Sequence, residues 1–337
     1  IKLTAGKIYQ KRDTMKAIWK GILLICLFVV VLKTAAAQET STFDANKGFL
    51  WLVNHCPKGN CENDMVSTAF YTLALKNSGA LAYADQGLEY IKSREDHSEH
   101  CWPSGGCKVK DTAFALWVLN EYGQDTEGAE TYLRNAVSAA PELRDHWYLE
   151  VVTSNSGLCK ISYDKAGESV QKDVRVEEGK FPDCSSPDAE TFFDLNACLE
   201  PGLLTNNPSI ELDVNCNELG PSTILSVIFT KDSVYHIIKK AESSRELFTI
   251  ENGCFGSTKK SSCSLDPTLF SNWILNAAGS DISVKLYAQN AYDQFSVVNA
   301  ALLYLSSTGE IRDQYLNDLV ALQRNDGSFN KQVYETA

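Results

Sequence analysis

Four segments decide the expected fold: TAFYTLALKNSG (68–79), TAFALWVLNEYG (112–123), TLFSNWILNAAG (268–279) and VNAALLYLSSTG (298–309). They align without gaps, and each reaches a glycine eleven residues after its first position. Each would form a helix that is apolar nearly all round, and such helices are buried on all sides. The closing glycine suits a left-handed C-cap, because glycine adopts positive φ without steric cost. The sequence therefore predicts a repeated, buried helix.

Amphipathic segments with a polar face lie between the buried ones. A buried helix, a short connection and a half-exposed helix, repeated, predict two concentric rings of helices, which is an α/α barrel. An open α-solenoid of the same helix pairs is the alternative. We favour the closed barrel, because solenoid helices seldom need to be apolar all round. The amphipathic segments are 43–55, 83–94, 126–140, 283–292 and 311–323.

Residues 144–252 differ in character from the repeats on either side. Short β-branched or alternating runs are separated there by Gly, Pro, Asn and Ser, a pattern typical of strands. It predicts a small antiparallel β-sandwich inserted between helical parts at 41–143 and 253–337, the second of which is expected to be truncated. Strands are expected at 147–153, 158–164, 174–178, 191–199, 209–216 and 223–230, with 234–239 as a strand or a helical turn.

The amino-terminal residues predict export. Residues 1–14 precede the first methionine, Met15, and are interpreted as an out-of-gene segment. A basic start, an apolar run at 21–32 and small residues up to Ala37 are the features of a signal peptide over 15–37, cleaved near Ala37. A retained membrane anchor is the alternative. The expected location is secreted or at the cell surface, with membrane contact only through the signal peptide.

Cysteine content agrees with export. Of 11 cysteines, Cys26 falls in the predicted signal peptide, and an even number remains. Even numbers of cysteines in exported chains favour disulfides over metal sites or catalytic thiols. Three pairs are close in sequence: Cys56 with Cys61, Cys101 with Cys107, and Cys254 with Cys263. The other four cysteines all lie in the β-rich insert and allow three pairings that stay open: Cys159, Cys184, Cys198 and Cys216.

The chain is acidic, with 43 Asp and Glu against 31 Lys and Arg. Residues 1–37 hold seven of the basic residues and one of the acidic ones, so the remainder carries 42 acids and 24 bases, a net charge of −18. Such a charge excludes nucleic acid as a partner on electrostatic grounds. The expected partners are an extracellular or cell-surface protein, a glycan, or further copies of the chain. No cofactor is expected.

The helical segments resemble the α/α-toroid superfamily of terpenoid cyclases, protein prenyltransferases and exported squalene-oxidase-type repeat proteins. The likeness covers about 41–141 and 264–337 and is strongest at YLNDLVALQRNDGSF (315–329). There Gln323 is followed by Gly-Ser-Phe, which is similar to the family's Gln…Gly-x-Trp/Phe motif. A looser copy places Trp102 in the aromatic position. The resemblance implies a mainly α fold, an α/α toroid that carries the β-rich insert.

The resemblance brings none of the family's active sites. The chain lacks the Asp-x-Asp-Asp and Asp-Asp-x-x-Asp clusters of terpenoid cyclases, and disulfide-bonded cysteines do not suit the prenyltransferase zinc site. The string nearest to the thioester motif Gly-Cys-Gly-Glu-Gln is GNCEN at 59–63, which departs from it. We therefore expect a non-catalytic exported protein for binding or assembly. The alternatives are a secreted enzyme acting on a polysaccharide or an isoprenoid lipid, and a transcobalamin-like carrier of a small molecule.

Three cysteines at equivalent places locate the candidate site. Cys61, Cys107 and Cys263 each lie five to seven residues before the first aligned position of a buried helix. The close-pair loops are therefore expected on one rim, at helix N-termini that favour anionic or carbonyl-rich ligands. The alternative is that small disulfides only staple exposed loops. The candidate ligand-binding residues on the rim or in the barrel are Glu99, Trp102, Asp111, Trp117 and Trp273.

Each candidate residue also has an alternative, purely structural role. His97 and His100 would chelate zinc with Asp96 or Glu99 if both imidazoles faced one way, but a solvated loop is favoured and no metal site is predicted. Asp111 is a helix-capping candidate as well as a rim carboxylate. Trp117 and Trp273 more often pack in a core than line a cavity. In the enzyme alternative, Asp111 or Glu99 would act as acid and base and Trp102 as a platform.

Overall fold

The computed structural model describes residues 45–143, 147–165, 167–186, 189–231, 234–259, 261–280, 282, 284–290, 296–324 and 329. Outside these lie the expected out-of-gene segment, the expected signal peptide at 15–37 with its cleavage near Ala37, and the Gly-Ser part of the repeat motif. The chain divides into two units, Ile1–Leu52 and Val53–Ala337. From the first unit the structure describes only the start of α2 (Ala45–His55). The second unit contains everything discussed below.

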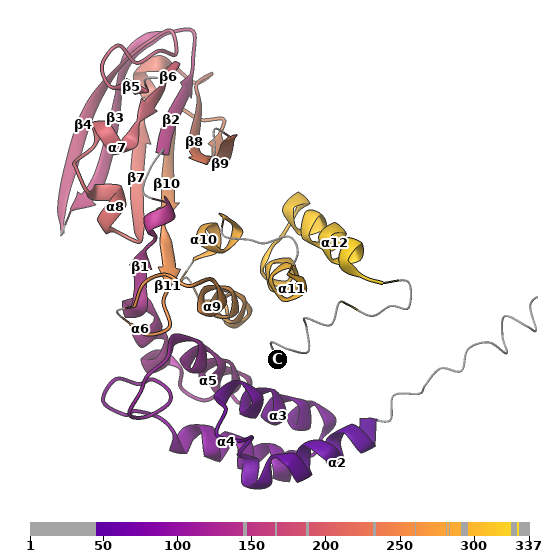
Figure 1. Cartoon of the computed structure of the whole chain (residues 1–337). Coiled ribbons are helices and arrows are strands. Elements are labelled where there is room, and N and C mark those ends of the chain that lie inside the picture. Colours follow the sequence, from indigo (N-terminus) through magenta and orange to yellow (C-terminus); the bar gives the residue numbers. More distant parts are fainter. Residues whose placement is uncertain are drawn as a thin grey trace, which may run out of the picture. The chain divides into compact units, whose positions relative to one another are not determined.

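The four apolar segments form helices that pack one against the next (Figure 1). A second helix packs against each of them, as the amphipathic segments predict. Gly79 and Gly279 close α3 and α9 with φ of 82° and 73°, in the left-handed conformation that the sequence pattern predicts. The apolar helices are α3 (Met65–Ser78), α5 (Val109–Glu121), α9 (Leu265–Ala278) and α11 (Val297–Ser306). Their partners are α4 (Leu81–Ser93), α6 (Glu127–Ala136), α10 (Lys285–Asn290) and α12 (Glu310–Leu322).

Two antiparallel sheets form between α6 and α9. One has four strands in the order β10-β7-β3-β4, and the other has five in the order β5-β6-β2-β8-β9. The four-stranded sheet consists of β3 (Ser156–Lys165), β4 (Glu168–Glu177), β7 (Ser209–Asn215) and β10 (Arg245–Glu251). The five-stranded sheet consists of β2 (Trp147–Val152), β5 (Ser185–Ser186), β6 (Ala189–Asp194), β8 (Ile224–Lys231) and β9 (Val234–Ala241).

The two sheets share a buried apolar core. Alternate residues of β2 and β8 contribute to it, and Trp147 lies opposite Phe229 with ring centroids 5.0 Å apart. Phe248 on β10 and Ile161 on β3 belong to the same core from the other sheet. Because only one face of each sheet is buried in this core, apolar and polar residues alternate along these strands.

All ten cysteines of the described chain are paired. The three close pairs in sequence are bonded to each other, and the four insert cysteines pair as Cys159–Cys216 and Cys184–Cys198. Five disulfides are typical of secreted or extracellular proteins. Among the described residues no helix is both long and apolar enough to span a membrane.

A third, two-stranded sheet was not expected from the sequence. β1 (Val137–Ala139) follows α6 directly and pairs with β11 (Gly253–Phe255), which leads to α9. The amphipathic pattern at 126–140 predicts one helix, but the helix ends at Ala136 and the chain continues as β1. Similarly, the strand expected at 191–199 is β6 followed by a short helix, α7 (Leu195–Cys198), because the Asp194 carboxylate accepts hydrogen bonds from the first N–H groups of that helix.

The expected fold class, a mainly α toroid with an insert, is wrong. The part of the chain that the structure describes is a mixed α and β structure, about 45% helical and 29% strand, with three antiparallel sheets and 11 strands. The prediction gave too much weight to the repeated helices and treated the strands as an appendage. In the structure the strands build the largest buried cluster, which also takes in Tyr287 from α10.

Candidate functional site

Buried threonines anchor the three disulfide loops to the helices. Thr68, Thr112 and Thr268 begin the aligned segments, and none of them is exposed to solvent. Each hydroxyl accepts a hydrogen bond from a backbone N–H of its loop: from Cys61 at 3.3 Å, from Trp102 at 3.0 Å and from Phe255 at 2.9 Å. The Thr112 and Thr268 hydroxyls also donate to a carbonyl four residues earlier in the chain. The recurring threonine therefore fixes each loop to the first turn of its helix.

Replacement of Thr268 by valine tests this anchor. The variant keeps the side-chain shape but leaves the buried Phe255 N–H without its acceptor, so we expect the free energy of unfolding to fall by about 1–3 kcal/mol. Thr268→Ser retains the hydroxyl and should recover most of the loss. Urea denaturation of the two variants measures the difference. A valine variant as stable as the wild type, with the loss found in the serine variant instead, would show that the methyl group, not the hydrogen bond, matters at this position.

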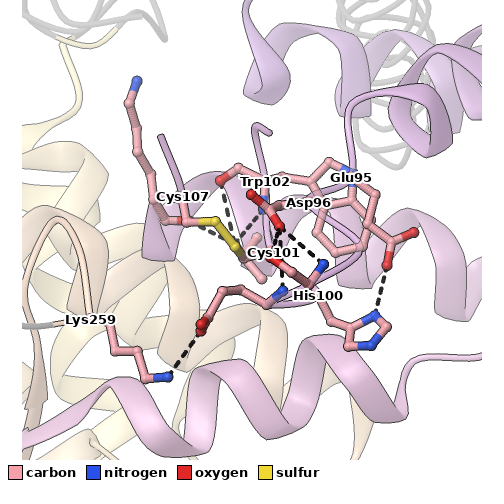
Figure 2. The surroundings of a disulfide bond; sticks show 11 residues. Glu95, Asp96, His100, Cys101, Trp102, Cys107 and Lys259 are labelled. Carbon is pink, nitrogen blue, oxygen red and sulfur yellow. Dashed lines mark hydrogen bonds and ion pairs between the residues drawn. A yellow bond between two sulfur atoms is a disulfide. The ribbon is translucent and has the colours of Figure 1, made fainter. Parts of the chain in front are cut away.

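The middle loop, residues 95–107, folds around one carboxylate and one disulfide (Figure 2). The Asp96 Oδ1 atom accepts hydrogen bonds from the Ser98 hydroxyl at 2.6 Å and from two backbone N–H groups. These hydrogen bonds, that of the Ser98 hydroxyl first, lower the pKa of Asp96. The Asp96 N–H also donates to the Cys101 carbonyl at 2.8 Å. Asp96 therefore holds the loop together through its Oδ1 atom and its backbone N–H.

Trp102 anchors the loop to the interior of the protein. Its side chain is buried, and its indole N–H donates to the Ile91 carbonyl at 2.7 Å. Trp102 borders the cavity described next but is only 2% exposed, so it does not offer the open ring face that a stacking platform needs.

An open cavity of about 770 Å³ lies beside this loop. Its main walls are the loop itself, α6 along most of its length, and Lys259 from the Cys254–Cys263 loop. Lys92 of α4 and Leu119 of α5 also line it. Figure 2 shows Lys259 reaching toward the loop that contains Cys101 and His100. Lys259 Nζ lies 3.2 Å from Glu99 Oε2 and 5.8 Å from the centroid of the Tyr132 ring. Two disulfide loops far apart in the sequence thus meet at one cavity. Its other polar lining residues include Glu95, His97, His100, Asp125, Glu127 and Asn135.

Glu95 brings the two histidines together. Its carboxylate lies 2.9 Å from Nδ1 of His100 and 3.3 Å from Nδ1 of His97. His100 packs tightly against α6, where a Cβ at Gly128 would come within 2.6 Å of the His100 ring. The imidazoles are thus arranged around a carboxylate rather than toward a shared ion. Among the described residues no group of three or more His, Cys, Asp or Glu could hold a metal.

The structure places Asp111 apart from this cavity. It lies in the first turn of α5, its side chain is 13% exposed, and Lys108 Nζ is 3.7 Å away. Burial raises the pKa of Asp111, and the nearby Lys108 opposes that shift while Asp64 adds to it. Asp111 is thus a partly desolvated carboxylate at a helix N-terminus, separate from Glu99 and Trp102.

The raised pKa of Asp111 predicts a pH dependence of stability. A carboxyl whose folded pKa exceeds its unfolded pKa of about 3.9 stabilises the fold below that pH, and the contribution is lost as the pH rises through the folded pKa. Asp111→Asn cannot ionise, so the variant should gain melting temperature relative to the wild type between pH 3 and pH 7. The exposed Asp266→Asn in the first turn of α9 is the control. A constant difference between wild type and Asp111→Asn would contradict the expectation.

Trp117 and Trp273 pack against each other rather than around an open space. Their ring centroids are 4.9 Å apart in an edge-to-face arrangement, and Trp117 is 5.9 Å from Phe70. Phe114 lies within 5.6 Å of both Phe70 and Phe270. The aromatic side chains of α3, α5 and α9 therefore contact one another in a continuous cluster. The two tryptophans act here as packing residues, the alternative considered from the sequence.

Of the candidate residues, the structure brings Glu99, His97, His100 and the buried Trp102 together at this cavity. Sequence reasoning missed Glu95, Lys259 and α6, which also line the cavity. Lys259 and Glu99 are 160 residues apart, and no local pattern connects them. Glu95 immediately precedes the polar loop that begins at Asp96. Because His97 and His100 follow it by two and five residues, its carboxylate could have been predicted to contact both imidazoles.

Comparison of the chain with protein-family models, with curated proteins and with solved structures gives no match. The expected membership of the α/α-toroid superfamily is therefore wrong, since neither a family model nor a relative supports it and the fold has three antiparallel sheets. The function of the chain must therefore be inferred from its own structure.

Proposed function

We propose that this is an extracellular, non-catalytic binding protein whose ligand site is the cavity between the Cys101–Cys107 loop, α6 and Lys259. The observation that carries the proposal is the cavity itself, about 770 Å³, which two disulfide-closed loops help to wall. Loops fixed by disulfides and buried hydroxyls lose little conformational entropy when a ligand binds, which favours recognition.

The lining of the cavity favours a polar ligand. Most of the lining residues carry a carboxylate, imidazole, ammonium, amide or hydroxyl group, while Trp102, Leu119, Ala129 and Tyr132 add an apolar part of comparable area. A carrier of an apolar small molecule needs the opposite lining, so that alternative receives no support from this cavity. An exposed glycan or a polar protein segment of a cell surface presents the hydroxyl, amide and ammonium groups that such a lining binds.

Binding to immobilised glycans and to whole cells tests the proposal. The Glu99→Ala variant removes a lining carboxylate and its ion pair with Lys259. We expect it to weaken binding about tenfold, the loss of one charge-assisted contact. Glu190→Ala is the matched control, because Glu190 forms a similar exposed pair with Lys180 at 3.0 Å on the β sheets. Equal binding by both variants would place the ligand elsewhere.

A secreted hydrolase is the second candidate, and one contact favours it. The Glu95 carboxylate near Nδ1 of His100 orients an imidazole in the way that general-base histidines are oriented. His97 and Glu99 line the same open cavity. Turnover of a polysaccharide or ester substrate that is lost in His100→Gln, with binding retained, would establish this candidate and exclude the non-catalytic one.

A further inference from the structure

Strand β9 is an open edge of the five-stranded sheet. It pairs with β8 on one side, and no described strand pairs with its other side. Its residues from Val234 to Lys240 are all exposed, with Ile237 at 61% and Val234 at 54%. An apolar edge strand of this kind offers unpaired N–H and C=O groups to another chain.

A cleft of about 500 Å³ runs beside this edge. Ile237 and Ile238 of β9 line one wall, and side chains of α10 and α12 line the other. The opposite wall combines apolar Leu286 and Ile311 with the amides of Gln289 and Gln314. A groove of apolar and amide groups next to an open strand suits an extended peptide, whose main chain needs hydrogen bonds and whose alternate side chains need pockets.

Charge distinguishes this edge from the rest of the chain. The residues after 37 carry a net charge of −18, yet β9 contains His236, Lys239 and Lys240. Lys239 is paired with Glu246 at 2.6 Å, whereas Lys240 and the cleft residue Lys285 have no ion pair among the described residues. The cleft is also lined by the Glu251 carboxylate of β10, so its lining is not purely basic. The two lysines without an ion pair among the described residues still offer ammonium groups beside an apolar strand, and these are complementary to an acidic segment.

The free edge of β9 also restricts which strands can pair with it. β8 and β9 lose register between Val227 and Ile228, which leaves Ile238 as an extra residue in a bulge. Regular pairing on the free side is therefore limited to the part of β9 that precedes the bulge. Bulges and lysines on an edge discourage pairing with like strands. A short, acidic strand is the kind that this edge still accepts.

We propose that β9 and its cleft bind an extended, acidic segment of a partner protein, which adds as a strand to the free edge of the five-stranded sheet. The main chain of the segment pairs with Val234 to Ile237. Its apolar side chains contact Ile237 and Ile238, and its carboxylates reach Lys240 and Lys285. This surface is separate from the cavity proposed as the ligand site.

Two synthetic octapeptides test the proposal on the full chain, one alternating valine with glutamate and the other valine with lysine. Calorimetric titration should show binding of the glutamate peptide only, and hydrogen exchange of the amides of β9 should slow in its presence. Ile237→Asp should weaken binding at least about tenfold, whereas Val320→Asp on α12, with the same 61% exposure, should leave it unchanged. Lys240→Glu should shift preference toward the lysine peptide.

Several results would overturn the inference. Binding of neither peptide, equal binding of both, or equal loss in Ile237→Asp and Val320→Asp would each do so. Sedimentation that shows self-association lost in Ile237→Asp would identify a second copy as the occupant instead. Circular dichroism of each variant confirms that a loss of binding does not come from unfolding.

Discussion

Removal of the Cys159–Cys216 disulfide by replacing both cysteines with alanine is expected to lower the free energy of unfolding by about 4 kcal/mol. The bond joins β3 to the residue after β7, across a sequence separation of 57 residues. Both cysteines are fully buried between the sheets. Loss of the bond frees a long loop in the unfolded chain, and the shorter side chains leave a gap in the core.

Guanidinium denaturation of the double variant under oxidising conditions measures this effect. The control is the Cys56–Cys61 pair, which closes a separation of only 5 residues and should cost clearly less. If both double variants lost the same stability, loop closure would not be the source of the stabilisation.

Phe114→Ala is expected to cost about 3–5 kcal/mol, because it removes a large buried ring from the centre of the helical core. Phe114 on α5 is not exposed at all, and it contacts Phe70 on α3 and Phe270 on α9. Its loss therefore opens a cavity where three helices meet. No neighbouring helix can close the gap without moving the other two.

Phe70→Ala is the matched control, since Phe70 belongs to the same aromatic cluster but is 45% exposed. It should cost less than half as much as Phe114→Ala in thermal or urea unfolding. Equal losses would mean that the cluster stabilises the chain through its surface rather than through burial.

The sequence predicted the elements whose pattern is local. The gap-free alignment located α3, α5, α9 and α11, and alternation located β2, β3, β7 and β8. The fold class could not be predicted from local patterns, because a repeat of helices does not indicate how many strands form the rest of the core. The strand pair β1 and β11 depends on residues more than a hundred positions apart, such as Ser138 opposite Cys254.

The candidate site was predictable only where its residues are neighbours in the chain. The loop from Asp96 to Trp102 was recognised by its density of polar groups. The alignment also contained Thr68, Thr112 and Thr268, but their role as anchors depends on hydrogen bonds to loops that the sequence cannot orient. Trp117 and Trp273 occupy equivalent positions, and equivalence alone does not distinguish a cavity wall from a packed pair.

The pairing of β1 with β11 has a mechanical consequence. Val137 lies opposite Phe255, so the strand that leads into the two larger sheets and the strand that leads out of them are held together at the same end. Once the packing of α5 against α9 is broken, tension on the flanking helices acts on this short ladder, and antiparallel strands pulled from one end separate one residue pair at a time. While the two strands stay paired, they shield the sheets between them from that load. After they separate, the chain extends only as far as those sheets unfold, and the Cys159–Cys216 disulfide keeps the residues between those two cysteines from being extended.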